Sequence, residues 1–306
     1  MNVSLRHFLE QGPAVAAVAR TAAKALGQAL WSPAAGAPVV PGLLLHAIHT
    51  PPSADLVQDY VLHVGGDPQA YRDSIPPHLF PQWTFPLVAQ TLSGLPYPMM
   101  RVVNGGCRLR CNGVLPANAP LHTSARLESI DDNGRRAVLQ QHITSGPSEQ
   151  PDALVADLFA IVPLGGGAKS ASDAAPRTKE KGPAVPIEAR QLSVWHLDAN
   201  AGFDFAKLTG DINPIHWVPA YARMSGFRSV ILHGFGSMAR AFEGLVHGVC
   251  DGDVSALREL DVRFTRPLVL PASVGLYVHN NEVFVGDAPG GQAYLVGTFA
   301  TTAGVE

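Results

Sequence analysis

Helical and strand patterns of apolar residues follow one another along the C-terminal part of the chain. Within residues 234–248 the apolar side chains recur at helical spacing from Phe235 to Leu245, which predicts a helix with one buried face. Two stretches rich in β-branched and aromatic residues come next, 257–283 and 292–304, and these predict strands. The expected order is one long helix followed by an antiparallel set of strands.

The same order occurs earlier in the chain. Residues 82–95 predict a helix, and strand patterns follow in residues 105–130, 135–145 and 153–164. Both parts of the chain therefore place a helix before their strands.

A short sequence echo supports a duplication. The string LPANAPL, from Leu115 to Leu121, recurs as LPASVGL, from Leu270 to Leu276, after a helix and one strand in both parts. We expect an α+β protein made of two related units, each a long helix wrapped by an antiparallel sheet.

A change of composition separates the two units. Residues 165–187 contain three consecutive glycines, three prolines and many small or polar residues, which is typical of a flexible linker. We expect an N-terminal domain over 1–164 and a C-terminal domain over 188–306. The linker contains four basic residues, Lys169, Arg177, Lys179 and Lys181. They either form a solvated face or hold a phosphate.

The most apolar stretch near the N-terminus, residues 13–30, is interrupted by Arg20 and Lys24, so it does not predict a membrane helix. We expect a surface helix there, with Val15, Val18, Ala22 and Leu26 on its buried side. Because no longer apolar stretch follows, the protein is expected in the cytoplasm and not in a membrane.

Charge and cysteine content narrow the classes of partner. The chain has 22 Lys+Arg against 25 Asp+Glu, a formal net charge of −3, which predicts no nucleic-acid partner. The count of three cysteines is odd and no spacing predicts a zinc site, so a reducing compartment is expected.

The strongest chemical signal is the string TGDINPIHW. Asn213 precedes Pro214 and is pushed toward extended backbone, while proline suits the first position of a helical turn. The resulting bend can bring Asp211 and His216 to one water as an acid–base pair. The alternative is an Asx turn with a hydrogen-bonded histidine.

A second signal is the string VILHGFGSMA, in which His233 and Gly234 stand directly before a predicted helix. Backbone N–H groups at a helix start lack intrahelical partners and carry partial positive charge, so they can hold an oxygen that becomes negative. The alternative is that Gly234 only makes the turn into the helix.

Together, D-I-N-P-I-H and I-L-H-G-F resemble the signature of the MaoC-like, or (R)-specific enoyl-CoA hydratase, family of hot-dog proteins. The two-unit organisation is similar to the double hot-dog members, and residues 78–105 resemble bacterial acyl-thioester dehydratases. The resemblance implies a double hot-dog fold and a lyase of fatty acid metabolism. Its reaction would be the reversible addition of water to a trans-2-enoyl thioester of CoA or acyl carrier protein, giving a (3R)-hydroxyacyl thioester.

The resemblance also implies roles for individual residues. Asp211 and His216 fall on the catalytic pair, Asn213 on an orienting asparagine, and Gly234 on the glycine whose N–H holds the thioester oxygen. We expect His233, Phe235 and Trp217 to contact the substrate. No cofactor or metal is implied.

Several alternatives stay open. The same architecture serves thioesterases, and a non-catalytic acyl-binding module would keep the pocket. Asp211, His216 and His233 have the residue types of a non-haem iron site, although metal-free chemistry is expected. The N-terminal domain lacks the motif and is expected to supply room for the acyl chain. Because a double hot-dog chain already contains an internal pseudo-dimer, both a monomer and a homodimer are sensible, and the dimer is slightly preferred because closed two-fold assemblies are common.

Overall fold

A computed structural model of the protein describes residues 3–11, 38–164 and 182–302. The helix predicted over residues 13–30 and most of the linker predicted over 165–187 lie outside the described residues. The domain boundaries in the linker therefore remain a proposal.

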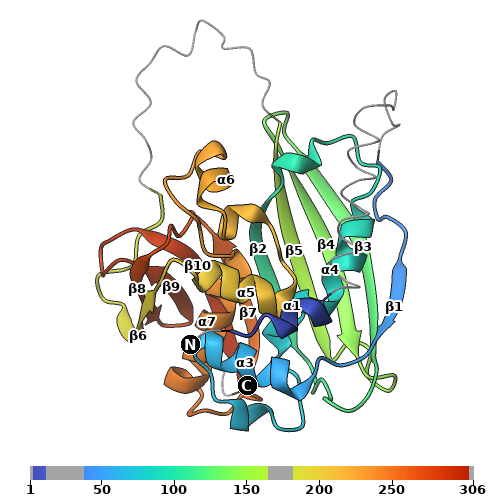
Figure 1. Ribbon diagram of the computed structural model, residues 1–306, viewed down its shortest axis with the longest axis horizontal. Coiled ribbons are helices and arrows are strands. Elements are labelled where there is room, and N and C mark those ends of the chain that lie inside the picture. The colour runs from blue at the N-terminus through green and yellow to red at the C-terminus, as the bar shows by residue number, and fades with distance from the viewer. Residues whose placement is uncertain (1–2, 12–37, 165–181, 303–306) are drawn as a thin grey trace, which may run out of the picture.

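Ten strands form one sheet in the described part of the chain (Figure 1). Their bounds are β1 (Leu45–His49), β2 (Val103–Cys111), β3 (Leu121–Asp132), β4 (Arg136–Gly146), β5 (Leu154–Pro163), β6 (Arg190–Leu197), β7 (Leu257–Phe264), β8 (Ala272–His279), β9 (Glu282–Gly286) and β10 (Ala293–Thr301).

The strand order shows that the sheet is duplicated. The order is β1-β3-β4-β5-β2-β7-β10-β9-β8-β6, and all neighbours are antiparallel. Each strand of the N-terminal half has its counterpart five strands later, so the order reads the same from either edge. The halves meet where β2 pairs with β7, for example at Cys107 opposite Val262. The two predicted sheets are therefore hydrogen-bonded into a single one.

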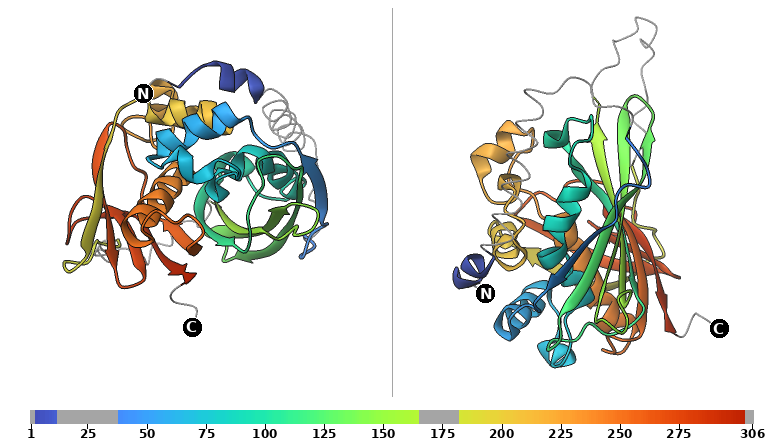
Figure 2. Two further views of the ribbon diagram at one scale, coloured as in Figure 1. Left: turned by 90° about the horizontal axis from the view of Figure 1, so that it is seen from below. Right: turned by 90° about the vertical axis from the view of Figure 1, so that its right-hand side faces the viewer.

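Each half of this sheet curls around one helix, as the view from below in Figure 2 shows. In the N-terminal half this helix is α4 (Pro81–Thr91), which packs on β3, β1 and β4. In the C-terminal half it is the longer α7 (Gly234–Val249), which packs on β7, β6 and β9. This arrangement confirms the expected α+β double hot-dog fold.

The remaining helices lie on one side of the sheet (Figure 2). The α-helices are α1 (Arg6–Glu10), α3 (Ala54–Val64), α5 (Ala201–Thr209) and α6 (Pro219–Met224). The single-turn 3₁₀ helices are η1 (Pro68–Tyr71), η2 (Pro77–Leu79), η3 (Met99–Arg101) and η4 (Pro214–His216). The sequence patterns predicted the central helices and seven of the strands, and they reached only the first two residues of β9. They did not predict β1, β6, α1, α3 or α5.

The buried face of α7 explains why that helix sits inside the sheet. Met238, Phe242 and Leu245 recur at helical spacing and are almost fully buried. Burying a side chain of this size stabilises a fold by about 1.5–3 kcal/mol relative to leaving it exposed. The apolar stripe of α7 therefore holds it against the concave face of the sheet.

A buried polar cluster ties the N-terminal half to α7. The carboxylate of Glu243 on α7 accepts a hydrogen bond from the hydroxyl of Tyr71 at 2.8 Å and lies 2.8 Å from Nε2 of His78. The hydroxyl of Tyr60 donates to the carbonyl oxygen of His78 at 3.0 Å. His78 is thus a hydrogen-bonded core histidine.

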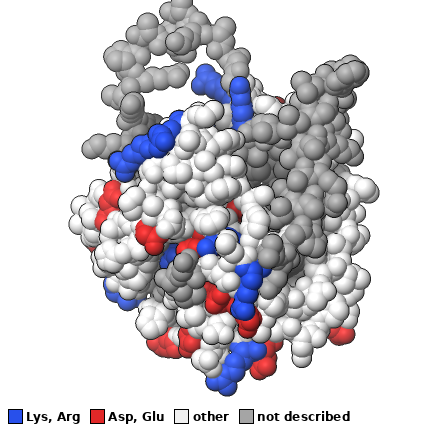
Figure 3. All heavy atoms as spheres, viewed as in Figure 1, with Lys and Arg blue, Asp and Glu red and all other residues white. Residues whose placement is uncertain are grey.

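The visible surface carries few charges. On the face in Figure 3, acidic and basic side chains are interspersed and no broad patch of one sign occurs. None of the helices in the described part of the chain combines the length and the apolar composition needed to cross a bilayer. All three cysteines are free thiols.

Candidate active site

The predicted bend lies between α5 and η4. Gly210, in the left-handed region at φ 76°, ends α5, and Pro214 occupies the first turn of η4. The side-chain oxygen of Asn213 accepts the backbone N–H of Ile215 at 3.3 Å and so caps η4. The Asx turn and the acid–base pair are thus not exclusive alternatives, because the turn is what places Asp211 beside His216.

His216 is buried and its tautomer is fixed by the backbone. Its Nδ1 lies 2.8 Å from the carbonyl oxygen of Ile231. Since a carbonyl only accepts, Nδ1 carries the hydrogen and Nε2 carries the lone pair. Burial lowers the pKa of His216, although Asp211 and the Ile231 carbonyl act in the opposite direction. The imidazole is therefore a neutral base.

Asp211 is held from the other side by His233. Nε2 of His233 donates to the backbone carbonyl of Asp211 at 3.1 Å and lies 3.9 Å from the carboxylate. Burial raises the pKa of Asp211, partly offset by His216 and by the N–H of Asn213. Burial, followed by the neighbouring His216, lowers the pKa of His233 well below its usual value.

The three side chains form one compact cluster. The rings of His216 and His233 stack with centroids 3.5 Å apart, and polar atoms of Asp211, His216 and His233 all lie within 4.8 Å of one another. The structure therefore brings together the two residues predicted as the catalytic pair.

The N-terminus of α7 lies beside this cluster. His233 has extended backbone at φ −59° and ψ 140°, and the helix begins at Gly234. Ser237 is the first residue whose N–H donates back to the carbonyl of His233. The amides before Ser237 are free to bind an anionic oxygen, since helix starts leave such donors without intrahelical partners.

Gly234 is required by packing and not by backbone conformation. Its φ is not among the positive values found in the chain. A Cβ at this position would lie 2.7 Å from the ring of Phe264 on β7. Glycine therefore lets the helix start approach β7, which goes beyond the alternative in which it only makes a turn.

A cavity of about 410 Å³ joins these groups to the N-terminal half. On the C-terminal side it is lined by Asp211, Asn213, His216, His233, Gly234 and Phe235, among others. On the N-terminal side it is lined mainly by apolar residues of α4 and β5, including Phe85, Val88, Leu92 and Leu158. Six of the seven predicted site residues line this one cavity.

Trp217 is the exception, because it is not part of the cavity lining. Its indole N–H donates to the carbonyl of Ile212 at 3.1 Å, and its ring packs against Phe203. The side chain is 39% exposed. The structure gives Trp217 a role in holding the loop around η4 and no contact with the cavity.

The metal alternative fits the donor atoms poorly. Asp211, His216 and His233 are the one group with metal-ligand proximity found among the described residues. However, Nδ1 of His216 and Nε2 of His233 are already bonded to backbone carbonyls. A metal at Nε2 of His233 would have to break its bond to Asp211, so we derive no metal-dependent step.

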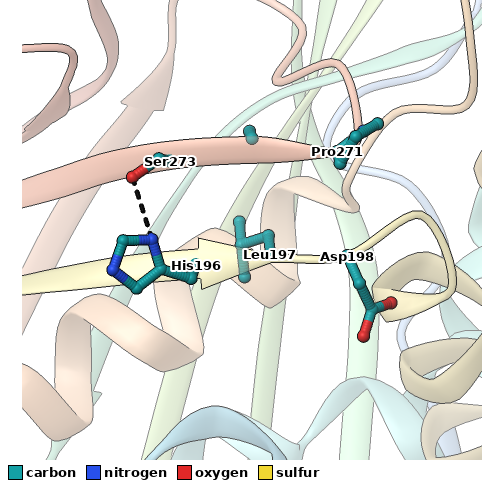
Figure 4. A pocket seen from close by; sticks show the side chains of 6 residues that line it. His196, Leu197, Asp198, Pro271 and Ser273 are labelled. Carbon is teal, nitrogen blue, oxygen red and sulfur yellow. Dashed lines mark hydrogen bonds between the residues drawn. The ribbon is translucent and has the colours of Figure 1, made fainter.

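A second, shallow pocket lies where β6 ends and β8 begins (Figure 4). Nδ1 of His196 lies 3.1 Å from the hydroxyl of Ser273, which resembles part of a hydrolytic triad. Asp198 points away from His196 in Figure 4, so this pair has no carboxylate to orient the imidazole. The pocket does not carry an activated serine.

Sequence reasoning missed three groups that shape the site. The carbonyl of Ile231 fixes the tautomer of His216, and the ring of Phe264 backs Gly234. Gly202 on α5 packs against the backbone of His216, because a Cβ at this position would collide with the carbonyl oxygen of His216. None of these contacts leaves a pattern in the sequence, because each joins positions far apart or uses a backbone atom.

The fold and the site define a class of protein, a double hot-dog with an Asp–His pair facing a helix N-terminus across one cavity. Residues 185–293 match the family model described as a MaoC like domain. The match assigns this part of the chain, which contains the whole Asp–His site, to a MaoC-like domain.

Proteins of known sequence and structure agree with that assignment. The chain is 28% identical to the peroxisomal enoyl-CoA hydratase 2 of Arabidopsis thaliana over 179 residues, which is 56% of this chain and 58% of the relative. It is 40% identical to 3-hydroxyacyl-thioester dehydratase X of Mycobacterium tuberculosis over 103 residues, 34% of each chain. The chain thus spans less than two thirds of the length of these relatives.

The fold also matches a solved structure. The crystal structure of HtdX from Mycobacterium tuberculosis aligns with a TM-score of 0.65 at 20% identity, covering 84% of this chain and 99% of that chain. This likeness shows that the two chains share the fold.

Proposed function

We propose that the protein is a hydro-lyase that adds water reversibly to trans-2-enoyl thioesters and forms (3R)-hydroxyacyl thioesters. The observation that carries the proposal is the meeting of Asp211 and His216 with the free amides of the α7 N-terminus on one cavity. The names of the relatives, enoyl-CoA hydratase 2 and 3-hydroxyacyl-thioester dehydratase X, support this reaction class.

The Asp–His pair binds the water and transfers one proton. A water between Asp211 and His216 places its oxygen on C3, and one of its hydrogens finishes on C2. Neutral His216 offers the lone pair of Nε2, and the nearby carboxylate of Asp211 holds or relays the proton. In dehydration the pair takes the proton from C2 and returns it to the departing hydroxyl, so no external acid is needed.

The start of α7 handles the negative charge. As the C2–H bond forms or breaks, charge develops on the thioester oxygen in an enolate-like transition state. In this proposal the N–H of Gly234 and the partial positive charge of the helix start, which begins at Gly234, hold such an oxygen. The role of Asn213 in this proposal is to hold η4, which it does through its hydrogen bond to Ile215.

The direct test uses enoyl thioesters of increasing chain length. Purified protein is mixed with crotonyl-CoA and longer trans-2-enoyl-CoA and acyl carrier protein thioesters, and the loss of the conjugated thioester absorbance is recorded. Chiral analysis of the product should give the (3R) alcohol. No turnover with any thioester would contradict the proposal, and release of free thiol would support a thioesterase in its place.

The proposal extends to the setting of the enzyme. The cavity draws apolar side chains from α4 and β5, which supports the N-terminal half as the site of the acyl chain. We keep the cytoplasm as the proposed compartment because all three cysteines are free thiols. A homodimer stays a prediction, to be measured by light scattering of the purified protein.

A further inference from the structure

Two polar side chains, Asn104 and Gln141, lie in the otherwise apolar N-terminal part of the cavity, and Gln141 is the buried one. Gln141, on β4, is 2% exposed and lines the cavity beside Val88, Leu92 and Leu158. A buried amide in apolar surroundings is costly unless its polar atoms have partners. Its partners therefore indicate what it does there.

The orientation of the Gln141 amide is fixed by α4. Its Nε2 donates to the carbonyl oxygen of Val88 at 2.9 Å and to the hydroxyl oxygen of Thr91 at 2.6 Å. The Thr91 hydroxyl donates its own hydrogen to the Val88 carbonyl at 2.8 Å. The Val88 carbonyl oxygen and the Thr91 hydroxyl oxygen therefore both accept from Gln141. A flipped amide would set its oxygen against two acceptors, which excludes that orientation.

The oxygen of the amide is thereby left without a donor. Both hydrogens of Nε2 are used on α4, and no described residue donates to Oε1. Oε1 is not one of the fully buried polar atoms that lack a partner, so it keeps some accessible surface. Because Gln141 lines the cavity, this unpaired acceptor is available to whatever occupies this part of it.

The distance of Gln141 from the reacting groups follows from the register of the sheet. Gln141 pairs with Leu158, Leu158 with Cys107, and Cys107 with Val262 on β7. Three strand spacings correspond to about 14 Å along the curved sheet. β7 carries Phe264, whose ring packs against Gly234, and the thioester is proposed to sit at Gly234. A long acyl chain that starts there would therefore reach Oε1 of Gln141 with its far end.

We propose that Gln141 is a specificity-determining residue that recognises an acyl chain bearing a hydroxyl group toward its methyl end. The inference rests on the proposed function, since the thioester end must sit at Asp211, His216 and Gly234. The hydroxyl donates to Oε1 of Gln141, while the chain on either side of it packs on the apolar side chains of α4 and β5. A site with an unpaired acceptor discriminates against a ligand that lacks the donor.

The experiment compares matched ligands in the unaltered protein. Saturated long-chain acyl-CoA thioesters, which cannot react, are titrated calorimetrically beside a series that carries one hydroxyl moved along the distal half of the chain. We expect one position to bind about tenfold more tightly than the plain chain, the size of one net hydrogen bond. Equal or weaker binding at every hydroxyl position overturns the inference.

Variants then locate the effect. Gln141→Leu and Gln141→Met should remove the preference for the hydroxylated chain without weakening the plain chain. Gln140→Leu is the matched control, because Gln140 is the preceding residue of β4 and faces the other side of the sheet, where it accepts a hydrogen bond from Ser129 at 3.1 Å. Persistence of the preference in both Gln141 variants, or its loss in the Gln140 variant, contradicts the assignment.

The two proposals fail separately. Binding is measured without turnover, so an inactive protein that still prefers the hydroxylated chain contradicts the hydro-lyase and supports Gln141. An active enzyme that turns over plain and hydroxylated enoyl thioesters with the same kcat/KM contradicts the role of Gln141 alone.

Discussion

Burial moves the pKa values of Asp211 and His216 toward each other. The pKa of the carboxyl is raised from 3.8 and that of the imidazole is lowered from 6.5, both chiefly because the charged form loses water. A smaller difference in proton affinity lowers the cost of passing a proton between the two groups in either direction, which suits a reversible reaction. The coupling also means that any measured pKa belongs to the pair.

The first prediction concerns the pair itself. Asp211→Asn and His216→Ala should each lower kcat by about 10²-fold or more, since general acid–base catalysis contributes about 10²–10⁴-fold. Steady-state kinetics with an enoyl-CoA substrate checks this, with circular dichroism to show that the fold is kept. Asp198→Asn is the matched control, because Asp198 lines only the shallow pocket of Figure 4. Near-normal kcat in either site variant would contradict the assigned roles.

The second prediction is the acid limb of the pH profile. Because burial lowers the pKa of His216, its neutral form persists below pH 6.5. Activity should therefore fall on acidification only as the pair gains a proton, with the midpoint for kcat/KM below 6.5. A profile of kcat/KM against pH on a plain enoyl-CoA measures it. A midpoint at or above the pKa of a free imidazole would mean that the neutral form of His216 is not the catalytically active form.

At the scale of elements, the helix start of α7 and the strand β7 fit each other through one glycine. The Phe264 ring occupies the space where Gly234 would otherwise carry a Cβ, at 2.7 Å from that position. Gly236, two residues further along α7, differs in this respect, because its nearest neighbour is an ordinary 3.5 Å from the Cβ position. The same helix thus offers a test position and a matched control.

The third prediction follows from that difference. Gly234→Ala should push the helix start from β7 and lower kcat by about 10²-fold, the usual cost of losing one oxyanion donor. Gly236→Ala should keep most activity, and better helix propensity should raise the free energy of unfolding by up to about 1 kcal/mol. Kinetics and urea unfolding of both variants provide the measurement. Equal loss of activity in the two variants would remove the special role of Gly234.

Much of this element-level arrangement could be predicted from the sequence. The apolar stripe of α7 and the proline at the start of η4 act over a few residues, so their patterns are visible in the chain. β1, β6 and α3 were not predicted. β6, for example, has an irregular burial pattern and lies at the edge of the sheet, where pairing with β8 decides its structure.

At the scale of the whole molecule, the two duplicated halves contribute different residues to the same cavity. Only the C-terminal half carries the Asp–His site, whereas α4 and β5 of the N-terminal half supply apolar walls of the same cavity. The continuous sheet through β2 and β7 fixes these walls relative to the site. We therefore expect chain-length preference to be set in one half of the protein and the chemistry in the other.

The fourth prediction tests this division. Val88→Phe on α4 should fill part of the distal cavity, so kcat/KM for long enoyl chains should fall by about tenfold or more while crotonyl-CoA is turned over normally. Each lost CH₂ contact accounts for about 0.8 kcal/mol of that discrimination. Gln90→Phe, at an exposed position of the same helix, is the control. A chain-length profile measured for the three proteins decides the matter, and a uniform loss across all lengths would contradict the division.

The sequence by itself determined the duplicated order of helix and strands, the bend at Pro214 and the helix start at Gly234. These features arise from backbone preferences and apolar periodicity, which act between residues close in the chain. Only the tertiary structure decided that Ile231 fixes the proton on His216, that Trp217 lies outside the cavity, and that α4 fixes the orientation of the Gln141 amide. Those contacts join distant segments across the sheet, and a pairing between distant segments leaves no periodic trace in the sequence of either one.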